Sequence, residues 1–516
     1  MKFESFPTCS QDLRGTALMI DKLPLQSHYE ARVEDLENSS ELELAIHKYL
    51  SNQSICLKNL IDTCAWHETL MSAEKTVENW KYLLTLTLLN YCISNSGKEL
   101  AAKVRLFEQK PWNQDSQYFR ILVALNHALT KMSVPEVGIS LLESGAALID
   151  LQEYSSWQAF PYIPHHLEFG IYLSILVYLT KRDDLKKSLI RLGKWQLNTL
   201  DANYKPLTAL FVREQNGDPE ENLLLYYLFF HCLTAITEEN EFISALEALS
   251  KQLKNRNYSK KIHPLWILIE SFFKRLPEKT TFFTLPEHIY DPSTSLVGYR
   301  SSNGCTVCTL HGGRTGLGCI KLKDVEIVNF GPQYLPLSEC LGFGIEGNHL
   351  SDHGLRKSII ELKKQGFSLK GCTRLVDQPS SSPFQIGLFR GIWLEVTQEL
   401  VQDRLNLKTT FLGLDGWEGT AFSFFAKAEK CRIKGVKTLL PGTLDRYEGN
   451  AQQISLESKA ASLNLNIPSF EGTVQVIPLA GKHDFWGANF LIAYILHSDQ
   501  KNYHWQIEFS KENFMD

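Results

Sequence analysis

The stretch that decides the first half of the fold is residues 176–214, which read LVYLTKRDDLKKSLIRLGKWQLNTLDANYKPLTALFVRE. Apolar residues recur at three- and four-residue intervals on both sides of a short polar break at Lys181-Arg182-Asp183. This spacing places the apolar side chains on one face of a helix, and a break this short joins helices as antiparallel neighbours. The second helix carries Trp195 and is followed by a loop with Pro206. The stretch therefore predicts a helical hairpin.

The same spacing recurs through the whole first half of the chain. A helix start is indicated at Asp218-Pro219, where Asp218 can cap the helix and Pro219 fits its first turn. Hairpins in series predict either a solenoid or a closed ring of helix pairs, and no fixed repeat of about 33 to 40 residues supports an ankyrin or tetratricopeptide array. The expected helices cover residues 41–60, 75–93, 116–132, 165–181, 183–200, 220–236, 239–253 and 263–276.

Glycine marks the boundary between two halves. Residues 1–285 contain 7 of the 31 glycines, and residues 286–516 contain the other 24. Glycine weakens helices and serves turns and bulges, so the second half is expected to consist of strands. The sequence thus predicts an all-α helical-hairpin domain over residues 1–285 and a large antiparallel β-sandwich over residues 286–516.

Strand periodicity supports this prediction for the second half. Residues 504–509 (HWQIEF) and 463–467 (LNLNI) alternate polar and apolar side chains, as half-buried strands do. Residues 393–400 and 405–412 indicate a hairpin around Gln402-Asp403-Arg404. For residues 353–364 the pattern leaves a helix and a pair of charged strands both open.

Composition excludes several classes of protein. The chain has 516 residues and a formal charge of −5, which gives no general attraction for nucleic acid. Its longest apolar runs have eleven residues, roughly half of the ~20 that a helix needs to cross a bilayer, so no membrane span is expected. No secretory signal is visible at the start, and eleven cysteines without repeated spacing indicate reduced thiols. A cytoplasmic location is expected.

The junction between the halves carries short fragments that point to a family. These are Leu296-Val297-Gly298-Tyr299-Arg300, Leu310-His311-Gly312-Gly313 and a strand at residues 324–330. Together with the hairpin at residues 176–214, this layout resembles the polysaccharide lyases of the heparinase II/III, alginate and chondroitin type. The resemblance implies an α/α toroid followed by a β-sandwich, and β-elimination of a uronate polymer. Gly316-Leu317-Gly318 stands where those lyases carry a His-rich motif, so the implied function is glycan binding with or without catalysis.

The resemblance also implies candidate site residues. Lyases of this kind neutralise a uronate carboxylate and remove the neighbouring proton with a tyrosine or histidine. His311, Tyr299 and Arg300 are the first catalytic candidates, and Arg446-Tyr447 is a second pair. The alternative is that arginine and tyrosine at strand ends make structural hydrogen bonds.

A second group of candidates lies in the helical half. Trp157, Tyr162, His165 and His166 occur in the segment WQAFPYIPHH, where aromatic rings could stack on sugar faces. Paired histidines at a helix start also act as caps, which is the structural alternative.

Three other motifs give weaker indications of a functional site. Cys305 and Cys308 are three residues apart on an expected strand, so their thiols should point to opposite faces. Residues 310–318 lack the lysine of a phosphate loop and predict a tight hairpin. Glu346, His349, Asp352 and His353 form a weak metal candidate that matches no standard zinc spacing. No cofactor is expected.

Two functions from different classes remain. The first is a carbohydrate-active or glycan-binding protein with lyase-like architecture, which implies a glycan partner. The second is a non-enzymatic interaction or scaffold protein that presents its surface to protein partners.

Overall fold

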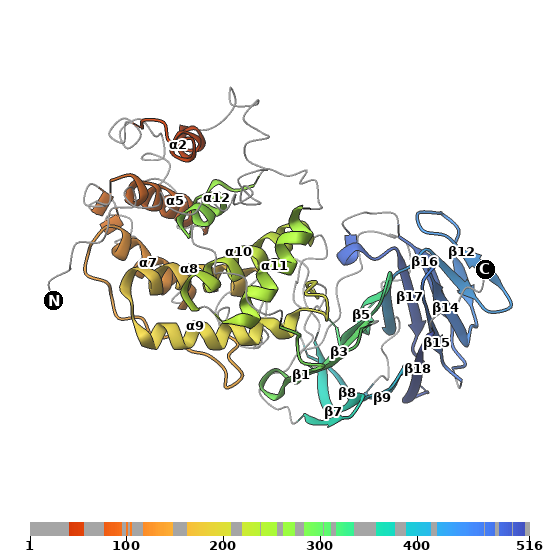
Figure 1. Ribbon diagram of the computed structural model, residues 1–516. Helices are drawn as coiled ribbons and strands as arrows, with labels where there is room; N and C mark the ends of the chain where they lie inside the picture. The colour runs from red at the N-terminus through yellow and green to blue at the C-terminus, as the bar shows by residue number, and fades with distance from the viewer. Residues whose placement is uncertain are drawn as a thin grey trace. The chain divides into compact units, whose positions relative to one another are not determined.

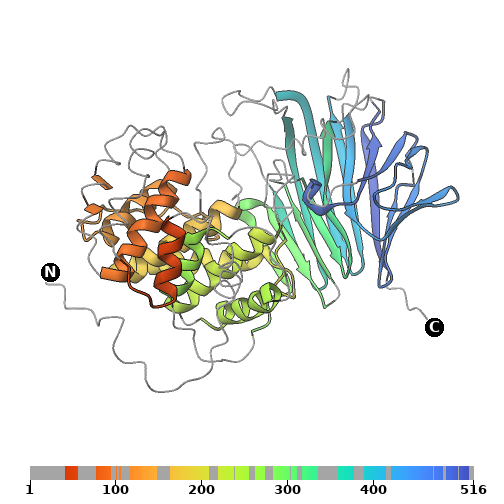
Figure 2. The ribbon, with the colours of Figure 1, turned by 90° about the horizontal axis from the view of Figure 1, so that it is seen from above.

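The structure is a computed structural model of the full chain, shown in Figures 1 and 2. It describes residues 41–55, 77–94, 100–101, 104–105, 117–147, 163–207, 219–237, 239–254, 262–273, 283–302, 304–310, 316–334, 358–376, 389–413, 420–468, 470–479, 484–497 and 499–510.

The first half of the described chain is helical, as predicted. Each of the eight expected segments contains an observed helix, and α10 begins at Pro219, the position that the start signal indicates. The helix expected over residues 41–60 ends earlier, at Leu50, and residues 51–55 are not helical. Helix α12 has His263 as its cap, where the side chain accepts a hydrogen bond from the Leu265 amide. The helices are α2 (Glu41–Leu50), α5 (Val77–Ser94), α7 (Gln117–Leu129), α8 (Ile163–Thr180), α9 (Asp183–Gln196), α10 (Pro219–Thr237), α11 (Asn240–Lys254) and α12 (Pro264–Phe272), with a 3-10 turn η2 (Leu197–Thr199) after α9.

In the part of the second half that the structure describes, the strands form two antiparallel sheets of nine strands each. The first sheet has the order β1-β2-β3-β4-β5-β10-β17-β16-β13, and the second has the order β12-β11-β14-β15-β18-β9-β8-β7-β6. The strands are β1 (His288–Asp291), β2 (Leu296–Arg300), β3 (Gly304–Thr309), β4 (Gly318–Leu322), β5 (Val325–Tyr334), β6 (Ile359–Lys363), β7 (Gly366–Val376), β8 (Phe389–Val401), β9 (Arg404–Leu412), β10 (Thr420–Lys427), β11 (Lys430–Ile433), β12 (Lys437–Leu439), β13 (Tyr447–Gly449), β14 (Gln453–Glu457), β15 (Ser462–Asn466), β16 (Val474–Pro478), β17 (Phe490–Ile495) and β18 (Asn502–Ser510).

The core of the sandwich lies between the two sheets. Phe422 from the first sheet stacks on Trp505 from the second, with ring centroids 4.2 Å apart. Both side chains are fully buried. Burying a large apolar side chain stabilises a fold by about 1.5–3 kcal/mol, so this inner layer is the main source of cohesion in the second half.

The expected hairpin in the second sheet is confirmed. Strands β8 and β9 pair in register from Leu400 with Leu405 to Trp393 with Leu412, and Gln402 takes a left-handed conformation in the turn. The segment at residues 353–364, which the sequence left open, contains strand β6. Its first residues lie outside the described part.

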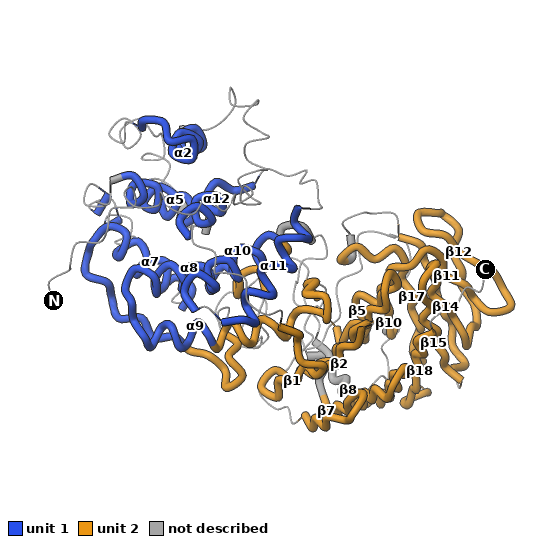
Figure 3. Tube along the Cα trace, in the orientation of Figure 1, with its two compact units in different colours: residues 1–139, 168–190, 224–281 blue, residues 140–167, 191–223, 282–516 orange. Residues whose placement is uncertain are grey.

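The chain divides into two compact units (Figure 3). Unit 1 comprises residues 1–139, 168–190 and 224–281, and unit 2 comprises residues 140–167, 191–223 and 282–516. Unit 2 thus contains the sandwich together with the end of α9, η2 and the loop that follows them. We call residues 191–207 the helical extension of the sandwich.

The helical unit buries a polar cluster of its own. Tyr227 donates to the Glu270 carboxylate at 2.7 Å, and His231 Nε2 lies 3.2 Å from the Glu270 carbonyl oxygen. Elsewhere in the unit, Glu168 accepts hydrogen bonds from Lys81 at 2.9 Å and from Tyr118 at 2.6 Å. Both carboxylates are buried, and these bonds offset the cost of removing them from water.

We predict that His231 makes the helical unit sensitive to acid. Burial lowers the pKa of His231 from 6.5 to about 4. The unfolded chain therefore binds the proton more readily, so stability is complete above pH 6.5 and falls progressively towards pH 4, by about 3 kcal/mol in total. His231→Gln keeps an N–H for the Glu270 carbonyl but cannot titrate. Urea unfolding followed by helical circular dichroism should show a shallower loss of stability between pH 6.5 and 4 in this variant, and an unchanged slope would refute the assignment.

Candidate functional site

The helical extension is held to the first sheet by a buried tryptophan. The indole Nε1 of Trp195 donates to Asp291 Oδ2 at 2.7 Å, and Asp291 also accepts the Ser293 amide at 2.8 Å and the Thr294 hydroxyl at 2.7 Å. Trp195 is 1% exposed and Asp291 is fully buried. A carboxylate that accepts this many bonds is satisfied in the interior, so Asp291 serves as an anchor for the extension.

His166, a sequence candidate, lies in the same region. Its Nε2 accepts the Ala147 amide at 3.0 Å, which places the ring proton on Nδ1, and Nδ1 then donates to Gln196 Oε1 at 2.8 Å. The ring packs against Trp195 at 4.8 Å and is fully buried. Both ring nitrogens are therefore engaged within the fold. His165, its neighbour, is partly buried.

Arg300 binds the backbone of the helical extension. Its guanidinium donates to the carbonyl oxygens of Leu197 at 2.7 Å, Leu200 at 2.8 Å and Pro286 at 2.9 Å. The side chain is 3% exposed, and burial lowers the pKa of Arg300 from its usual range. Three carbonyls at the end of η2 and before β1 thus share one cation, which satisfies backbone acceptors that the end of a helix leaves open.

A buried ion pair lies next to this arginine. Lys321 Nζ is 2.8 Å from Asp201 Oδ2, with side-chain exposures of 18% and 6%. Asp201 Oδ1 accepts the amides of Asn203 and Lys205, so the carboxylate also closes the loop after η2. Burial lowers the pKa of Lys321, but Glu326 and Asp201 outweigh it and the pKa is raised. Lys321 is therefore a charged ammonium at neutral pH.

A pocket of about 250 Å³ opens at the mouth of the sandwich, where the ends of the two sheets meet. We call it the mouth pocket. Its walls come from both sheets and from the β8–β9 turn, and include Tyr299, Thr306, Lys321, Leu400, Asp403 and Phe509. One of the sequence candidates, Tyr299, thus lines a cavity.

Tyr299 and Arg300 are adjacent on β2 and point to opposite faces. Tyr299 packs against the sandwich core and lines the mouth pocket, whereas Arg300 bonds to the helical extension. Burial and the neighbouring Glu287 carboxylate raise the pKa of Tyr299. Its hydroxyl therefore keeps its proton at neutral pH and is a weaker acid than a tyrosine in water.

The CxxC cysteines diverge as expected. Cys308 belongs to the sandwich core, and Cys305 lines the mouth pocket. Both are free thiols, and burial raises the pKa of Cys305 to about 12. A thiol with so high a pKa is not a nucleophile at neutral pH.

The second Arg/Tyr pair lies far from the first. Tyr447 is on β13, the last strand of the first sheet, and donates to the Asn450 carbonyl at 2.9 Å; Arg446 is exposed. Seven strand steps separate β13 from β2, which is roughly 33 Å at about 4.8 Å per strand. The structure thus does not bring Arg446 and Tyr447 together with Tyr299 and Arg300.

Several sequence candidates lie outside the described residues: Trp157, Tyr162, His311, Glu346, His349, Asp352 and His353. Their roles stay predictions. Within the described ranges, no group of three or more histidine, cysteine, aspartate or glutamate side chains is arranged to hold a metal ion. Nor does any helix there combine the length and apolarity needed to cross a membrane.

Sequence reasoning missed Asp291, Asp201 and Lys321. Asp291-Pro292-Ser293 is a readable cap signal, because aspartate before Pro caps the short 3-10 turn η4 (Pro292–Thr294). Lys321 and Asp201 are 120 residues apart, and nothing local in the sequence indicates that they pair.

Comparison with known proteins bears on the fold alone. No protein-family model and no curated protein sequence matches the chain. Among solved structures, a xanthan lyase from Paenibacillus is similar with a TM-score of 0.50 and 10% identity, over 84% of this chain and 48% of the lyase chain. The chondroitin AC lyase of Streptomyces coelicolor A3, in complex with chondroitin sulphate, gives a TM-score of 0.42 and 11% identity over 84% of this chain and 67% of that one.

The chain thus spans about half the length of the xanthan lyase. Helices followed by two large antiparallel sheets give it an architecture similar to that of the xanthan lyase, and the predicted fold class is confirmed.

We predict that Trp195→Phe destabilises the sandwich unit. The variant keeps most of the apolar surface but leaves the buried Asp291 Oδ2 without its indole donor, a loss of about 1–3 kcal/mol. Tyr494→Phe is the matched control, since the buried Tyr494 hydroxyl has no hydrogen-bond partner among the described residues. Chemical unfolding followed by near-ultraviolet circular dichroism measures the free energy of unfolding of both variants. Equal stability of Trp195→Phe and the wild type would contradict the anchoring role of Asp291.

Proposed function

We propose that this protein binds an acidic sugar unit of a glycan in the mouth pocket. One observation carries the proposal: Lys321, a charged lysine with unused hydrogen-bond donors, is among the residues that line the mouth pocket, with its ammonium on the face of the first sheet that Arg300 also occupies. An ammonium has three N–H donors. Within the described part of the chain, only Asp201 accepts from Lys321, which leaves two donors for a ligand. A uronate carboxylate is the acceptor that such a group binds best among sugar substituents.

The size of the pocket limits what it takes. Its volume of about 250 Å³ is below the roughly 300–1,000 Å³ of pockets for drug-sized ligands. This supports the binding of one sugar ring, or of a chain end, rather than a long polymer segment. Gln365 and Gln402 add amide groups to the lining, which suit the hydroxyl groups of the same ring.

The lyase-like architecture supports β-elimination as the chemistry of such a site. In that step a base removes the proton from the carbon that bears the carboxylate, and a carbon–carbon double bond forms as the bond to the leaving oxygen breaks. The leaving oxygen then takes a proton. Tyr299 lines the pocket and carries its proton at neutral pH, so we assign this donation to its hydroxyl. The base remains a prediction at His311.

Arg300 and His166 act in this proposal as positioning residues. Both are buried and bonded within the sandwich unit, where they hold the helical extension that supplies Asp201. Asp201 in turn orients Lys321. Glycan contacts by Trp157, Tyr162 and His165, and a catalytic role for Arg446-Tyr447, remain predictions from the sequence.

The test removes the lysine charge together with the Asp201 charge that pairs with it, and Glu326 keeps Lys427 as a neighbouring cation. In Asp201→Asn/Lys321→Met both charges are lost, and the asparagine oxygen can still accept the loop amides. We expect the affinity for uronic-acid oligosaccharides, measured by isothermal titration calorimetry over a panel of uronate polymers, to fall about 10- to 100-fold, since a hydrogen bond to a charged group contributes about 1.5–3 kcal/mol.

Two further variants serve as controls for this experiment. Asp201→Asn alone keeps the ammonium and should bind at least as tightly as the wild type. Lys323→Met removes an exposed lysine two residues away and should bind normally. Binding that is unaffected in the double variant would refute the site. Ultraviolet detection of unsaturated products, compared between the wild type and His311→Ala, shows whether binding leads to elimination.

A second candidate function rests on an exposed apolar patch. Val436, Leu440 and Leu444 are 55%, 55% and 103% exposed, and they lie within one segment around β12. Exposed apolar side chains grouped in this way are typical of protein-interaction surfaces. Absence of binding to every uronate polymer would favour this interaction function over the glycan function.

A further inference from the structure

The outer face of the second sheet is polar along its central strands. On β14, β15, β18 and β9, alternate residues belong to the sandwich core, among them Ile454, Leu465, Ile507 and Leu405. Their neighbours in sequence must point away from the core, because successive side chains of a strand face opposite sides. The outward positions of these four strands therefore form one continuous surface.

Four amide side chains line up across this surface. Gln453 on β14 pairs with Asn466 on β15, Asn466 pairs with Gln506 on β18, and Gln506 pairs with Asn406 on β9. We call these four residues the amide row. At about 4.8 Å per strand the row is about 14 Å long. All four side chains are partly exposed.

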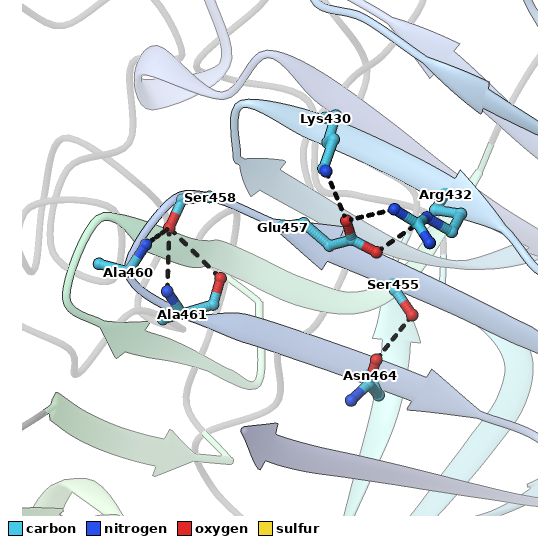
Figure 4. A network of polar contacts seen from close by, with 8 residues as sticks. All are labelled: Lys430, Arg432, Ser455, Glu457, Ser458, Ala460, Ala461 and Asn464. Carbon is cyan, nitrogen blue, oxygen red and sulfur yellow. Dashed lines mark hydrogen bonds and ion pairs between the residues drawn. The ribbon is translucent and has the colours of Figure 1, made fainter. Parts of the chain in front are cut away.

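The amide row differs from the polar groups beside it. In the neighbouring positions Ser455 donates to Asn464 at 2.6 Å, and Glu457 accepts from Lys430 and Arg432 (Figure 4). Those side chains are hydrogen-bonded or ion-paired to one another. Within the described chain, by contrast, none of the four amides forms a side-chain hydrogen bond. The row is thus a line of unused donors and acceptors between groups that are already satisfied.

Most charges around the row are paired, and Lys408 on β9 is an exposed charge without an ion pair among the described residues. Arg404 lies 2.7 Å from Glu508, and Glu399, which continues the row on β8, pairs with Lys363. Opposite charges that neutralise each other weaken the local field that would attract an acidic or a basic partner. The row has no aromatic or arginine anchor of the kind that dominates protein interfaces.

These properties select an uncharged ligand with many hydroxyl groups. Each amide offers an N–H donor pair and a carbonyl acceptor, and a hydroxyl group can both accept and donate. Strand spacing repeats these groups at about the length of one sugar ring. The backbone ladder fixes their order, so little freedom is lost when a ligand binds along them.

We propose that the amide row is a binding site for a neutral polysaccharide chain, which lies across strands β14, β15, β18 and β9. This site is separate from the mouth pocket in both position and chemistry. The mouth pocket uses a lysine and takes one acidic unit, whereas the amide row uses amides and takes an extended neutral segment. The inference does not rest on the proposed function of the pocket.

The experiment is affinity gel electrophoresis of the full chain through hydroxyethyl cellulose, dextran and soluble starch. At least one of these neutral polymers should retard the wild type. The variant Asn466→Val/Gln506→Val replaces two central amides with a residue that favours strands, so the sheet is retained. Its affinity should fall about 5- to 150-fold, because two hydrogen bonds of about 0.5–1.5 kcal/mol each are lost.

Asn464→Val is the matched control. It removes an amide from the same strand and face, but one that is already bonded to Ser455, and retardation should stay as in the wild type. The more conservative Asn466→Gln should retain binding because it keeps an amide. Thermal unfolding confirms that each variant is folded.

Equal retardation of the double variant and the wild type would overturn the proposal, as would no retardation by any neutral polymer. So would a dimer in sedimentation that only the double variant loses, because the row would then bind a second copy of the chain.

The Asp201→Asn/Lys321→Met variant separates the two sites. It should lose uronide binding and keep retardation in the neutral polymer. Loss of both in this variant would contradict the independence of the amide row.

Discussion

The bonds from Arg300 to the carbonyl oxygens of Leu197 and Leu200 are the constraint on which the sandwich unit depends. They hold the end of a helix against the outer face of a sheet, where carbonyls would otherwise be buried without donors. Arginine suits this task, since its planar guanidinium has five donors in a fixed geometry and stays charged when buried. The loop that follows is then placed so that Asp201 reaches Lys321.

The same arrangement explains why the described seam between helix and sheet is polar. Trp195, Asp291, His166 and Gln196 extend the network on one side of Arg300, and the Asp201–Lys321 pair extends it on the other. Every bond in it lies within unit 2. Burying these polar groups costs desolvation free energy. In return, the network favours one arrangement of helix and sheet, because each group must meet its own hydrogen-bond partner. It fixes the ammonium of Lys321 on the face of the sheet that Arg300 occupies, which an aliphatic seam could not do.

Local pattern was sufficient to predict the elements. The polar break at residues 181–183, the turn at residues 402–404 and the alternation in residues 504–509 each determine their own backbone through nearby residues, and each expected element is present. The prediction of a β-sandwich in the second half came from its high glycine content, because glycine disfavours helices wherever it occurs.

The site was harder to predict because it depends on distant residues. Trp195 and Asp291 are 96 positions apart, and the amide row exists only through the register of four strands. The opposite directions of Tyr299 and Arg300 could have been read from strand alternation, which separates neighbouring side chains. The groups that Tyr299 and Arg300 contact could not be predicted in this way, because those contacts depend on packing between segments that are far apart in sequence.

Native-state hydrogen exchange of the loop after η2 tests the central claim most directly. If Arg300 joins the helical extension to the first sheet, the amides of Asp201, Tyr204 and Leu207 should exchange together with strands β2–β4, at the free energy of unfolding of the sandwich. Arg300→Lys, which cannot bind three carbonyls in the same geometry, should release these amides first. Rapid exchange of this loop in the wild type, while β2–β4 remain protected, would contradict the account.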